Sequence, residues 1–126
     1  MPSVRRRSCA TAAAVAALLL AAGCGGGEPT ARARDGRVAI TLDDFSISPQ
    51  RVRMRAGEAT FEIVNEGRIG HNFHVVGRRG EPVAVTTLLP GDRETATANL
   101  RRGDYRMLCT VSNHEELGMY GTLVVR

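Results

Sequence analysis

Short β-rich runs separated by turn residues make up most of the chain, and this pattern restricts its fold more than any other feature. Eight such runs are present, and no segment shows a long helical period. The runs are Arg37–Asp43, Arg51–Arg55, Ala59–Asn65, His71–Val76, Val83–Leu88, Thr95–Leu100, Asp104–Cys109 and Gly121–Arg126. Strands of this length and spacing predict an all-β fold, an antiparallel sandwich or barrel of about eight strands. The few aromatic residues, Phe45, Phe61, Phe73, Tyr105 and Tyr120, are predicted to anchor its core.

The N-terminal residues 1–23 have the pattern of a secretory signal peptide. Three arginines at positions 5–7 precede an uncharged apolar run from Ala10 to Ala22, which is shorter than the roughly 20 residues that span a bilayer. The run ends in Leu20-Ala21-Ala22-Gly23-Cys24, which resembles the bacterial lipoprotein signal. In that signal the cysteine is lipidated and becomes the N-terminal residue. Cleavage by an ordinary signal peptidase, leaving a soluble secreted protein, is the alternative.

A flexible linker is predicted from residue 24 to residue 36. It begins Cys24-Gly25-Gly26-Gly27 and continues with polar residues and Pro29, a composition that cannot bury a core. The folded domain is then expected to cover residues 37–126. A domain of this size has a small core, and a bound metal would help to stabilise it.

Charge and cysteine content narrow the functions that are possible. The formal charge is +4, but the signal peptide removes three arginines and no acid, which leaves +1. We therefore expect no nucleic-acid binding. Cys9 is lost with the signal peptide and Cys24 is predicted to carry the lipid. Cys109 is then the only free thiol in an exported protein, where it should be buried, reactive or bound to a metal.

The segment C-T-V-S-N-H-E-E-L-G-M contains three residues that are suited to binding a metal. Cys109, His114 and Met119 are each separated by four residues and lie between two predicted strands. A Cys, two His and a weak axial Met form the ligand set of electron-transfer copper sites. The second histidine is His71 or His74. These two lie three residues apart, so in a strand they point to opposite faces and do not easily bind one metal.

The domain resembles the cupredoxins, the plastocyanin and azurin family of blue copper proteins, from about Val38 to Val125. The resemblance is strongest at Gly70-His71-Asn72-Phe73 and from Cys109 to the end of that range. It implies a Greek-key β-sandwich that binds one type 1 copper ion. The ligands that it implies are His71, which Asn72 follows, and then Cys109, His114 and Met119.

The resemblance also implies how the surroundings of the site are built. The Asn72 side chain would bridge to the segment near Thr110, and His114 would lie at the solvent edge. Gly70, Ile69 and Leu117 would form an apolar docking patch around it, or would be ordinary loop residues. The acidic pairs Asp43-Asp44 and Glu115-Glu116 are expected to be solvated.

The function expected from these features is one-electron transfer, with copper cycling between Cu(I) and Cu(II), and not enzyme catalysis. The protein would work on the outer side of the cytoplasmic membrane, anchored through the lipid on Cys24, or would be secreted if it is not lipidated. Redox proteins are the expected partners and a monomer is the expected state. The alternative is a protein that binds or delivers copper without redox turnover. Structural zinc is disfavoured because Met is a poor zinc ligand.

Overall fold

Buried and exposed side chains alternate along the strands, so each strand contributes one face to a shared core. In the run Arg37–Asp43, for example, Val38, Ile40 and Leu42 are buried while the residues between them are more exposed. The structure is a computed structural model that describes residues 29–126. In this part of the chain there is no helix, and hence none that could cross a membrane.

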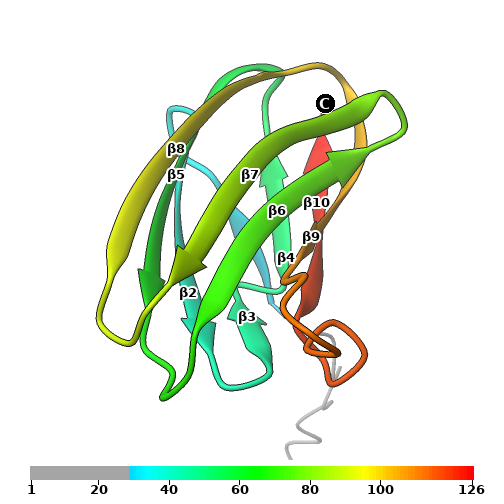
Figure 1. Ribbon diagram of the computed structural model, residues 1–126. Coiled ribbons are helices and arrows are strands. Elements are labelled where there is room, and N and C mark those ends of the chain that lie inside the picture. Colours follow the sequence, from blue (N-terminus) through cyan, green and yellow to red (C-terminus); the bar gives the residue numbers. More distant parts are fainter. Residues whose placement is uncertain (1–28) are drawn as a thin grey trace, which may run out of the picture.

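The strands form two sheets that enclose the core (Figure 1). The six-stranded sheet has the order β1-β4-β10-β9-β6-β7, and the four-stranded sheet has the order β3-β2-β5-β8. The strand bounds are β1 Thr30–Arg32, β2 Arg37–Asp43, β3 Ser46–Ser48, β4 Arg51–Met54, β5 Gly57–Asn65, β6 His71–Gly77, β7 Gly80–Leu88, β8 Arg93–Leu100, β9 Gly103–Leu108 and β10 Tyr120–Val125.

The predicted sandwich is confirmed, with two corrections to its details. All eight predicted runs are strands, but β1 and β3 are additional strands of three residues each. The sheets are mixed and not purely antiparallel, because β1 pairs with β4, β4 with β10, and β2 with β5 in parallel. Parallel pairing arises where neighbours in a sheet are not joined by a hairpin. β2 and β5, for instance, are separated in the chain by β3 and β4. The sheets do not close into a barrel.

The prediction of a flexible linker up to residue 36 is wrong for its last part. Thr30–Arg32 form β1, which pairs in parallel with Arg51–Arg53 of β4. The pairing continues beyond the strand, because the Ala33 N–H donates to the Arg53 carbonyl at 2.9 Å. These backbone bonds hold a segment that has few apolar residues, which explains why composition did not reveal it. The predicted signal peptide, Cys24 and the glycine run lie outside the described residues.

The core confirms some of the expected aromatic anchors and corrects others. Phe61 and Phe73 are fully buried, with ring centroids 5.7 Å apart. Phe45 and Tyr120, in contrast, are 40% and 42% exposed. Phe45 lies in the turn between β2 and β3, and Tyr120 is the first residue of β10.

The connections between strands gather at two opposite ends of the sandwich. The lower end in Figure 1 contains the connections 44–45, 66–70, 89–92 and 109–119. The upper end contains the connections 33–36, 55–56, 78–79 and 101–102. Since β6, β9 and β10 begin or end at the lower end, all the predicted ligands belong to that end.

Candidate metal centre

Strand pairing at the lower end brings distant parts of the chain together. β6 begins at His71 and runs antiparallel to β9, which ends at Leu108. β9 is also antiparallel to β10, so Cys109 just after β9 faces Met119 just before β10. The Cys109 N–H donates to the Met119 carbonyl at 3.0 Å. Both ends of the 109–119 loop therefore lie beside the first residue of β6.

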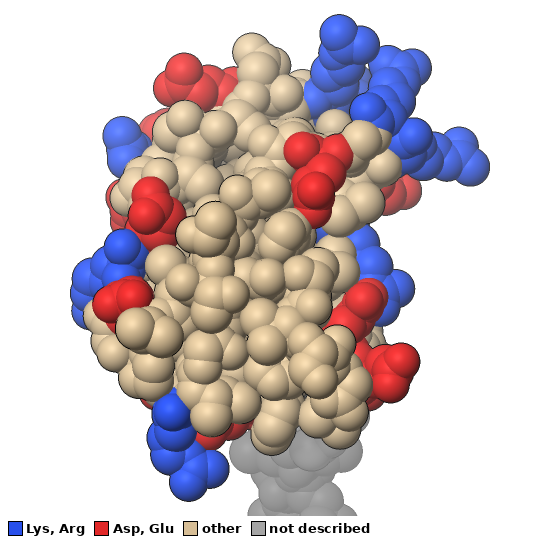
Figure 2. Space-filling model, in the orientation of Figure 1, with Lys and Arg blue, Asp and Glu red and all other residues tan. Residues whose placement is uncertain are grey.

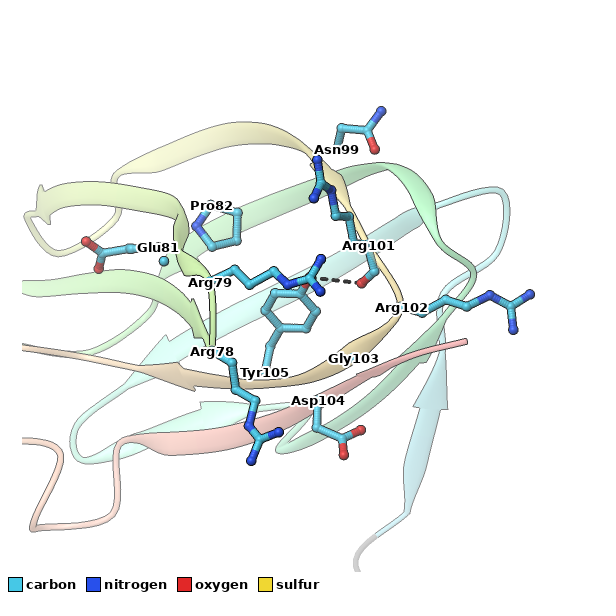
Figure 3. A pocket seen from close by; sticks show the side chains of 11 residues that line it. Arg78, Arg79, Glu81, Pro82, Asn99, Arg101, Arg102, Gly103, Asp104 and Tyr105 are labelled. Atoms are coloured by element: carbon cyan, nitrogen blue, oxygen red, sulfur yellow. Dashed lines mark hydrogen bonds between the residues drawn. The ribbon is translucent and has the colours of Figure 1, made fainter.

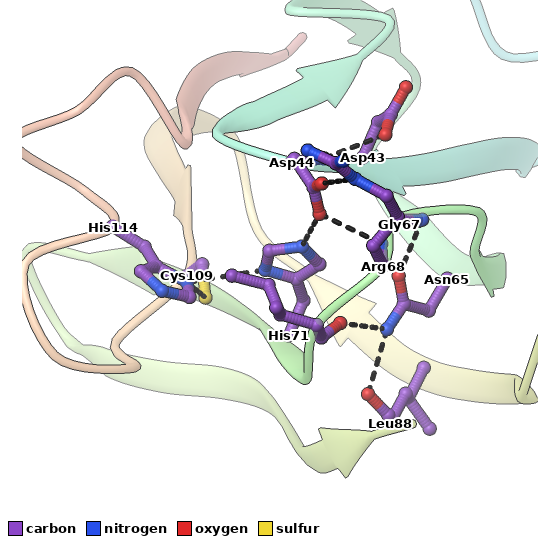
Figure 4. Close-up of polar contacts among 10 residues, drawn as sticks. Asp43, Asp44, Asn65, Gly67, Arg68, His71, Leu88, Cys109 and His114 are labelled. Carbon is purple, nitrogen blue, oxygen red and sulfur yellow. Dashed lines mark hydrogen bonds and ion pairs between the residues drawn. The ribbon is translucent and has the colours of Figure 1, made fainter. Parts of the chain in front are cut away.

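Three side chains from these segments point toward one another (Figure 4). Nδ1 of His71 lies 3.2 Å from Nδ1 of His114, and Sγ of Cys109 lies 3.7 Å from the same His114 nitrogen. The three potential ligand atoms all lie within 4.8 Å of one another. His71 and Cys109 are fully buried and His114 is 7% exposed. Two nitrogens and one sulfur thus face a single buried point.

The spacing of these atoms fits a metal ion bound between them. Bonds of about 2.0 Å to nitrogen and about 2.3 Å to sulfur, in a trigonal arrangement, would separate the two nitrogens by about 3.5 Å and the nitrogen from the sulfur by about 3.7 Å. The observed separations are 3.2 Å and 3.7 Å. Two imidazoles and one thiolate in a trigonal plane are typical of type 1 copper. The donors present therefore fit such an ion.

Met119 is fully buried in the same core as Cys109. Its backbone is bound to both of the other predicted ligands of the loop, because its N–H donates to the His114 carbonyl at 3.0 Å and its carbonyl accepts from Cys109. Gly118 precedes it with a φ of +123°, and a Cβ there would lie 3.0 Å from the Phe45 carbonyl oxygen. Glycine at this position lets the loop close against the 44–45 turn.

A carboxylate contacts the side of His71 that faces away from the other donors. Nε2 of His71 lies 3.4 Å from Oδ1 of Asp44. Arg68 donates to the same carboxylate twice, from its side chain at 2.8 Å and from its backbone N–H at 2.9 Å (Figure 4). These bonds lower the pKa of Asp44 to about 2. An ionised acceptor favours the tautomer with the proton on Nε2, which leaves the Nδ1 lone pair free to bind a metal.

The expectation that Asp44 is merely solvated is therefore wrong. The residue is half-buried and is engaged by His71 and Arg68. It lies 27 residues from His71 in the sequence, and no local pattern connects the two positions. Only the turn between β2 and β3 places them together.

Asn65, at the end of β5, and Gly67, in the loop that follows, lie beside the Asp44–His71 pair and shape the space around it. The Asn65 side chain is fully buried and donates to the carbonyls of Ile69 and Leu88, at 2.9 Å each, while it accepts from the Gly67 N–H at 2.9 Å. A Cβ at Gly67 would lie 2.7 Å from Oδ1 of Asp44 and 2.8 Å from Nε2 of His71. A larger residue at Gly67 would therefore displace the Asp44–His71 contact.

The side-chain bridge expected between Asn72 and the segment after Cys109 is present. Asn72 donates to Oγ1 of Thr110 at 2.8 Å and accepts from the Thr110 N–H at 2.7 Å. His74, on the same side of β6 as Asn72, does not approach the three donors. It is hydrogen-bonded to Glu81 on the neighbouring strand β7. The geometry thus agrees with the choice of His71 that the resemblance implied, and with the expectation from alternation that the two histidines do not share one metal.

His114 lies between the buried site and the surface. Burial is the main cause that lowers the pKa of His114, and the nearby His71 lowers this pKa further. A lowered pKa favours the neutral imidazole, which is the form that binds metals. The ring of Phe45 packs edge-on against His114, with centroids 5.3 Å apart and planes at 89°. Phe45, Ile69 and Leu117 are all exposed at this end, and sequence reasoning had missed the first of them.

Comparison with known proteins agrees with this arrangement. A family model described as a cupredoxin-like domain matches residues 11–125. The chain belongs to the cupredoxin-like family. No curated protein sequence matches it.

Solved structures of several cupredoxins share the fold. Reduced auracyanin from Roseiflexus castenholzii is 20% identical, with a TM-score of 0.68 over 75% of this chain and 99% of that one. An azurin from Methylomonas sp. strain J is 15% identical, with a TM-score of 0.64 over 74% and 99% of the two chains. Rusticyanin from Thiobacillus ferrooxidans is 15% identical, with a TM-score of 0.63 over 77% and 82%. Rusticyanin is described as a copper protein. At these identities the likeness shows the fold alone.

Proposed function

We propose that this chain carries single electrons on a type 1 copper ion held by His71, Cys109 and His114, with Met119 as a weak axial ligand. The observation that supports this most directly is the buried triangle formed by two Nδ1 atoms and one Sγ atom. A copper ion bound there supplies a centre that cycles between Cu(I) and Cu(II). Thiolate suits Cu(I) and imidazole suits both states, so one set of donors serves both.

The chain's own contacts hold the donors in place. Asp44 orients the ring of His71 through its Nε2. Asn72 ties the start of β6 to Thr110, next to Cys109. Because these contacts restrict movement of the donors, the site needs little rearrangement when an electron arrives or leaves.

Electron transfer fits this site better than catalysis or delivery of copper. Catalytic metal sites keep an open position for substrate, whereas four side chains acting as ligands would leave no easy position for one. A delivery protein must release its metal, and donors that are at most 7% exposed oppose release. Non-redox copper delivery is kept as the alternative function.

The visible spectrum tests the proposal. We expect the full chain to turn intensely blue with Cu(II), through charge transfer from the Cys109 thiolate, and to be bleached and restored by one-electron reductants and oxidants. Cys109→Ser and His71→Ala should remove the colour, and His74→Ala should keep it. A pale Cu(II) spectrum that persists in Cys109→Ser would contradict the proposed site. A blue protein that cannot be cycled would favour the delivery function.

We also propose that redox proteins dock at the lower end, on the exposed side chains of Phe45, Ile69 and Leu117. This surface lies at the same end as His114, whose ring packs against Phe45. A partner bound there would be near the site without needing to open it. The protein would act as a monomer.

For the cellular location of the protein, the support comes from the sequence alone. We propose that the chain is held on the outer side of the cytoplasmic membrane by a lipid on Cys24, because a basic segment and an apolar run precede that cysteine. We expect the wild type in the membrane fraction and Cys24→Ser in the soluble fraction. Equal distribution of the two would contradict lipid anchoring and would favour secretion.

A further inference from the structure

A hollow of about 940 Å³ lies at the upper end, opposite the candidate metal centre. Its volume is in the range of ligand pockets, about 300–1,000 Å³. It is bounded by the 78–79 turn between β6 and β7 and by the 101–102 turn between β8 and β9 (Figure 3). Tyr105 lines it, and the Tyr105 hydroxyl donates to the Arg101 carbonyl at 2.9 Å, which ties the second turn to β9.

Each of the two turns contributes a pair of adjacent, exposed arginines: Arg78 and Arg79 from the first, Arg101 and Arg102 from the second. Arg79 and Arg101 both line the hollow; the Arg79 side chain passes over the Tyr105 ring, and that of Arg101 extends toward Asn99 (Figure 3). Arg78 and Arg102 point away from the centre of the hollow. Two guanidinium groups from separate turns therefore border the same space.

The acidic residues that line this hollow are engaged elsewhere. Glu81 is hydrogen-bonded to His74, and Asp104 pairs with Arg126 at 2.7 Å. Within residues 29–126, none of the four arginines forms an ion pair. Their guanidinium groups thus keep their N–H donors free of carboxylate partners within the described residues.

The charge of the strand connections differs in sign between the two ends of the molecule. At the lower end, five acidic residues and one arginine give −4. At the upper end, six arginines and one aspartate give +5. Figure 2 shows arginine side chains gathered at the upper right, where the β6–β7 turn lies. Such a field attracts anions to the upper end and repels them from the lower end.

We propose that this hollow binds a phosphate-bearing anion through Arg79 and Arg101, with Arg78 and Arg102 adding positive charge at its rim. A guanidinium group presents paired N–H donors that match two phosphate oxygens. Because the two arginines come from separate turns, each can bind its own phosphate, so a ligand with two linked phosphates suits the hollow. A soluble polyphosphate presents two linked phosphates, and a phospholipid headgroup presents a single phosphate that one of the guanidinium groups could bind.

Isothermal titration calorimetry with pyrophosphate at low ionic strength tests whether the hollow binds a soluble polyphosphate. The full chain would carry Cys24→Ser, so that no lipid on that residue contributes. We expect saturable binding of one pyrophosphate per chain, weakened about tenfold for each guanidinium group removed in Arg79→Gln/Arg101→Gln. The matched control is Arg51→Gln/Arg53→Gln, which removes two exposed arginines from β4. It should bind within about twofold of the parent, since charges outside the hollow contribute weakly.

Flotation with phosphatidylcholine vesicles, with and without phosphatidic acid, tests whether the hollow binds a phospholipid headgroup. Binding only to vesicles that contain phosphatidic acid, lost in Arg79→Gln/Arg101→Gln and displaced by pyrophosphate, would identify a headgroup as the ligand. Pyrophosphate binding without flotation would identify a soluble ligand. Equal loss in the hollow variant and the β4 variant would overturn the proposal, because it would show a diffuse charge effect. No saturable binding in either assay would overturn it as well. An unchanged near-UV circular dichroism spectrum would show that both variants are folded.

Discussion

Asp44 influences the candidate metal centre although its carboxylate lies on the far side of His71. Arg68 holds that carboxylate with two hydrogen bonds and keeps its pKa near 2, so it stays ionised at neutral pH. The carboxylate in turn faces Nε2 of His71 at 3.4 Å. Gly67 fits beside this pair only because it has no side chain. At the scale of single residues, the proposed ligand His71 is thus in contact with a group of three neighbours, Asp44, Arg68 and Gly67, that are not themselves proposed as ligands.

Replacing Asp44 should weaken copper binding and leave the fold intact. We expect Asp44→Ala to lower the affinity for copper about 10- to 100-fold, because His71 loses the acceptor that orients its ring. Asp44→Asn, which keeps an oxygen acceptor, should fall between Asp44→Ala and the parent. Competition with a copper chelator measures the affinity, and urea unfolding of the metal-free chain checks the fold. The matched control is Glu116→Ala, which removes an exposed acidic residue at the same end. Equal affinity in Asp44→Ala and this control would exclude the role of Asp44.

Two asparagines join the strands and loops of the lower end. Asn65, at the end of β5, makes three side-chain hydrogen bonds that tie the 66–70 loop to β7. Asn72, in β6, makes two that tie this strand to the segment after β9. At the scale of elements, these bonds hold the start of β6 in position between two loops. They replace strand pairing at the point where the sheets end.

The two asparagines should differ in their contributions to stability. Asn65→Ala removes three hydrogen bonds, two of which are buried, and we expect it to lower the free energy of unfolding by about 2–4 kcal/mol. Asn72→Ala affects a more exposed bridge and should cost about 1–2 kcal/mol. Urea unfolding of the metal-free chain measures both, with Thr86→Ala on the exposed face of β7 as the control. The interpretation of Asn65 fails if its variant is as stable as the control.

The whole molecule has opposite charges at its two ends. The connections around the candidate metal centre carry −4 and those at the other end carry +5. Charge separated in this way orients a molecule as it approaches a charged partner. A partner that meets the lower end therefore encounters exposed apolar side chains among acidic ones.

The rate of electron exchange should depend on ionic strength, because the two ends of the molecule carry opposite charges. With a cationic inorganic redox complex, we expect the rate to fall as the ionic strength rises from about 0.01 M to about 1 M, since the Debye length shortens from about 30 Å to about 3 Å. With an anionic complex the rate should rise over the same range. Stopped-flow bleaching of the blue colour measures both rates. Glu66→Gln/Glu116→Gln should reduce the difference between the complexes, and identical salt responses in the parent would contradict steering by the lower end.

Much of the scaffold was predictable because its signals are local. Alternation along runs such as Arg37–Asp43 reflects one buried face and needs no tertiary information. β1 and β3 were missed because three residues are too few to show a period. The parallel pairing of β2 with β5 was missed as well, since it depends on how the chain passes between the two sheets.

By itself, the sequence determined the strand-forming runs, the one free thiol of the predicted domain and a loop that places Cys109, His114 and Met119 at even spacing. Alternation in a strand, a local property, also indicated that His71 and His74 do not bind the same metal, and the resemblance at His71-Asn72 favoured His71. Only the tertiary structure decided that the His71, Cys109 and His114 side chains meet at one buried point. It alone brought Asp44 to His71 and gathered arginines from two turns at the opposite end. Such contacts join residues that are far apart in the chain, and strand order in the folded sheets, not the local sequence, determines which of them meet.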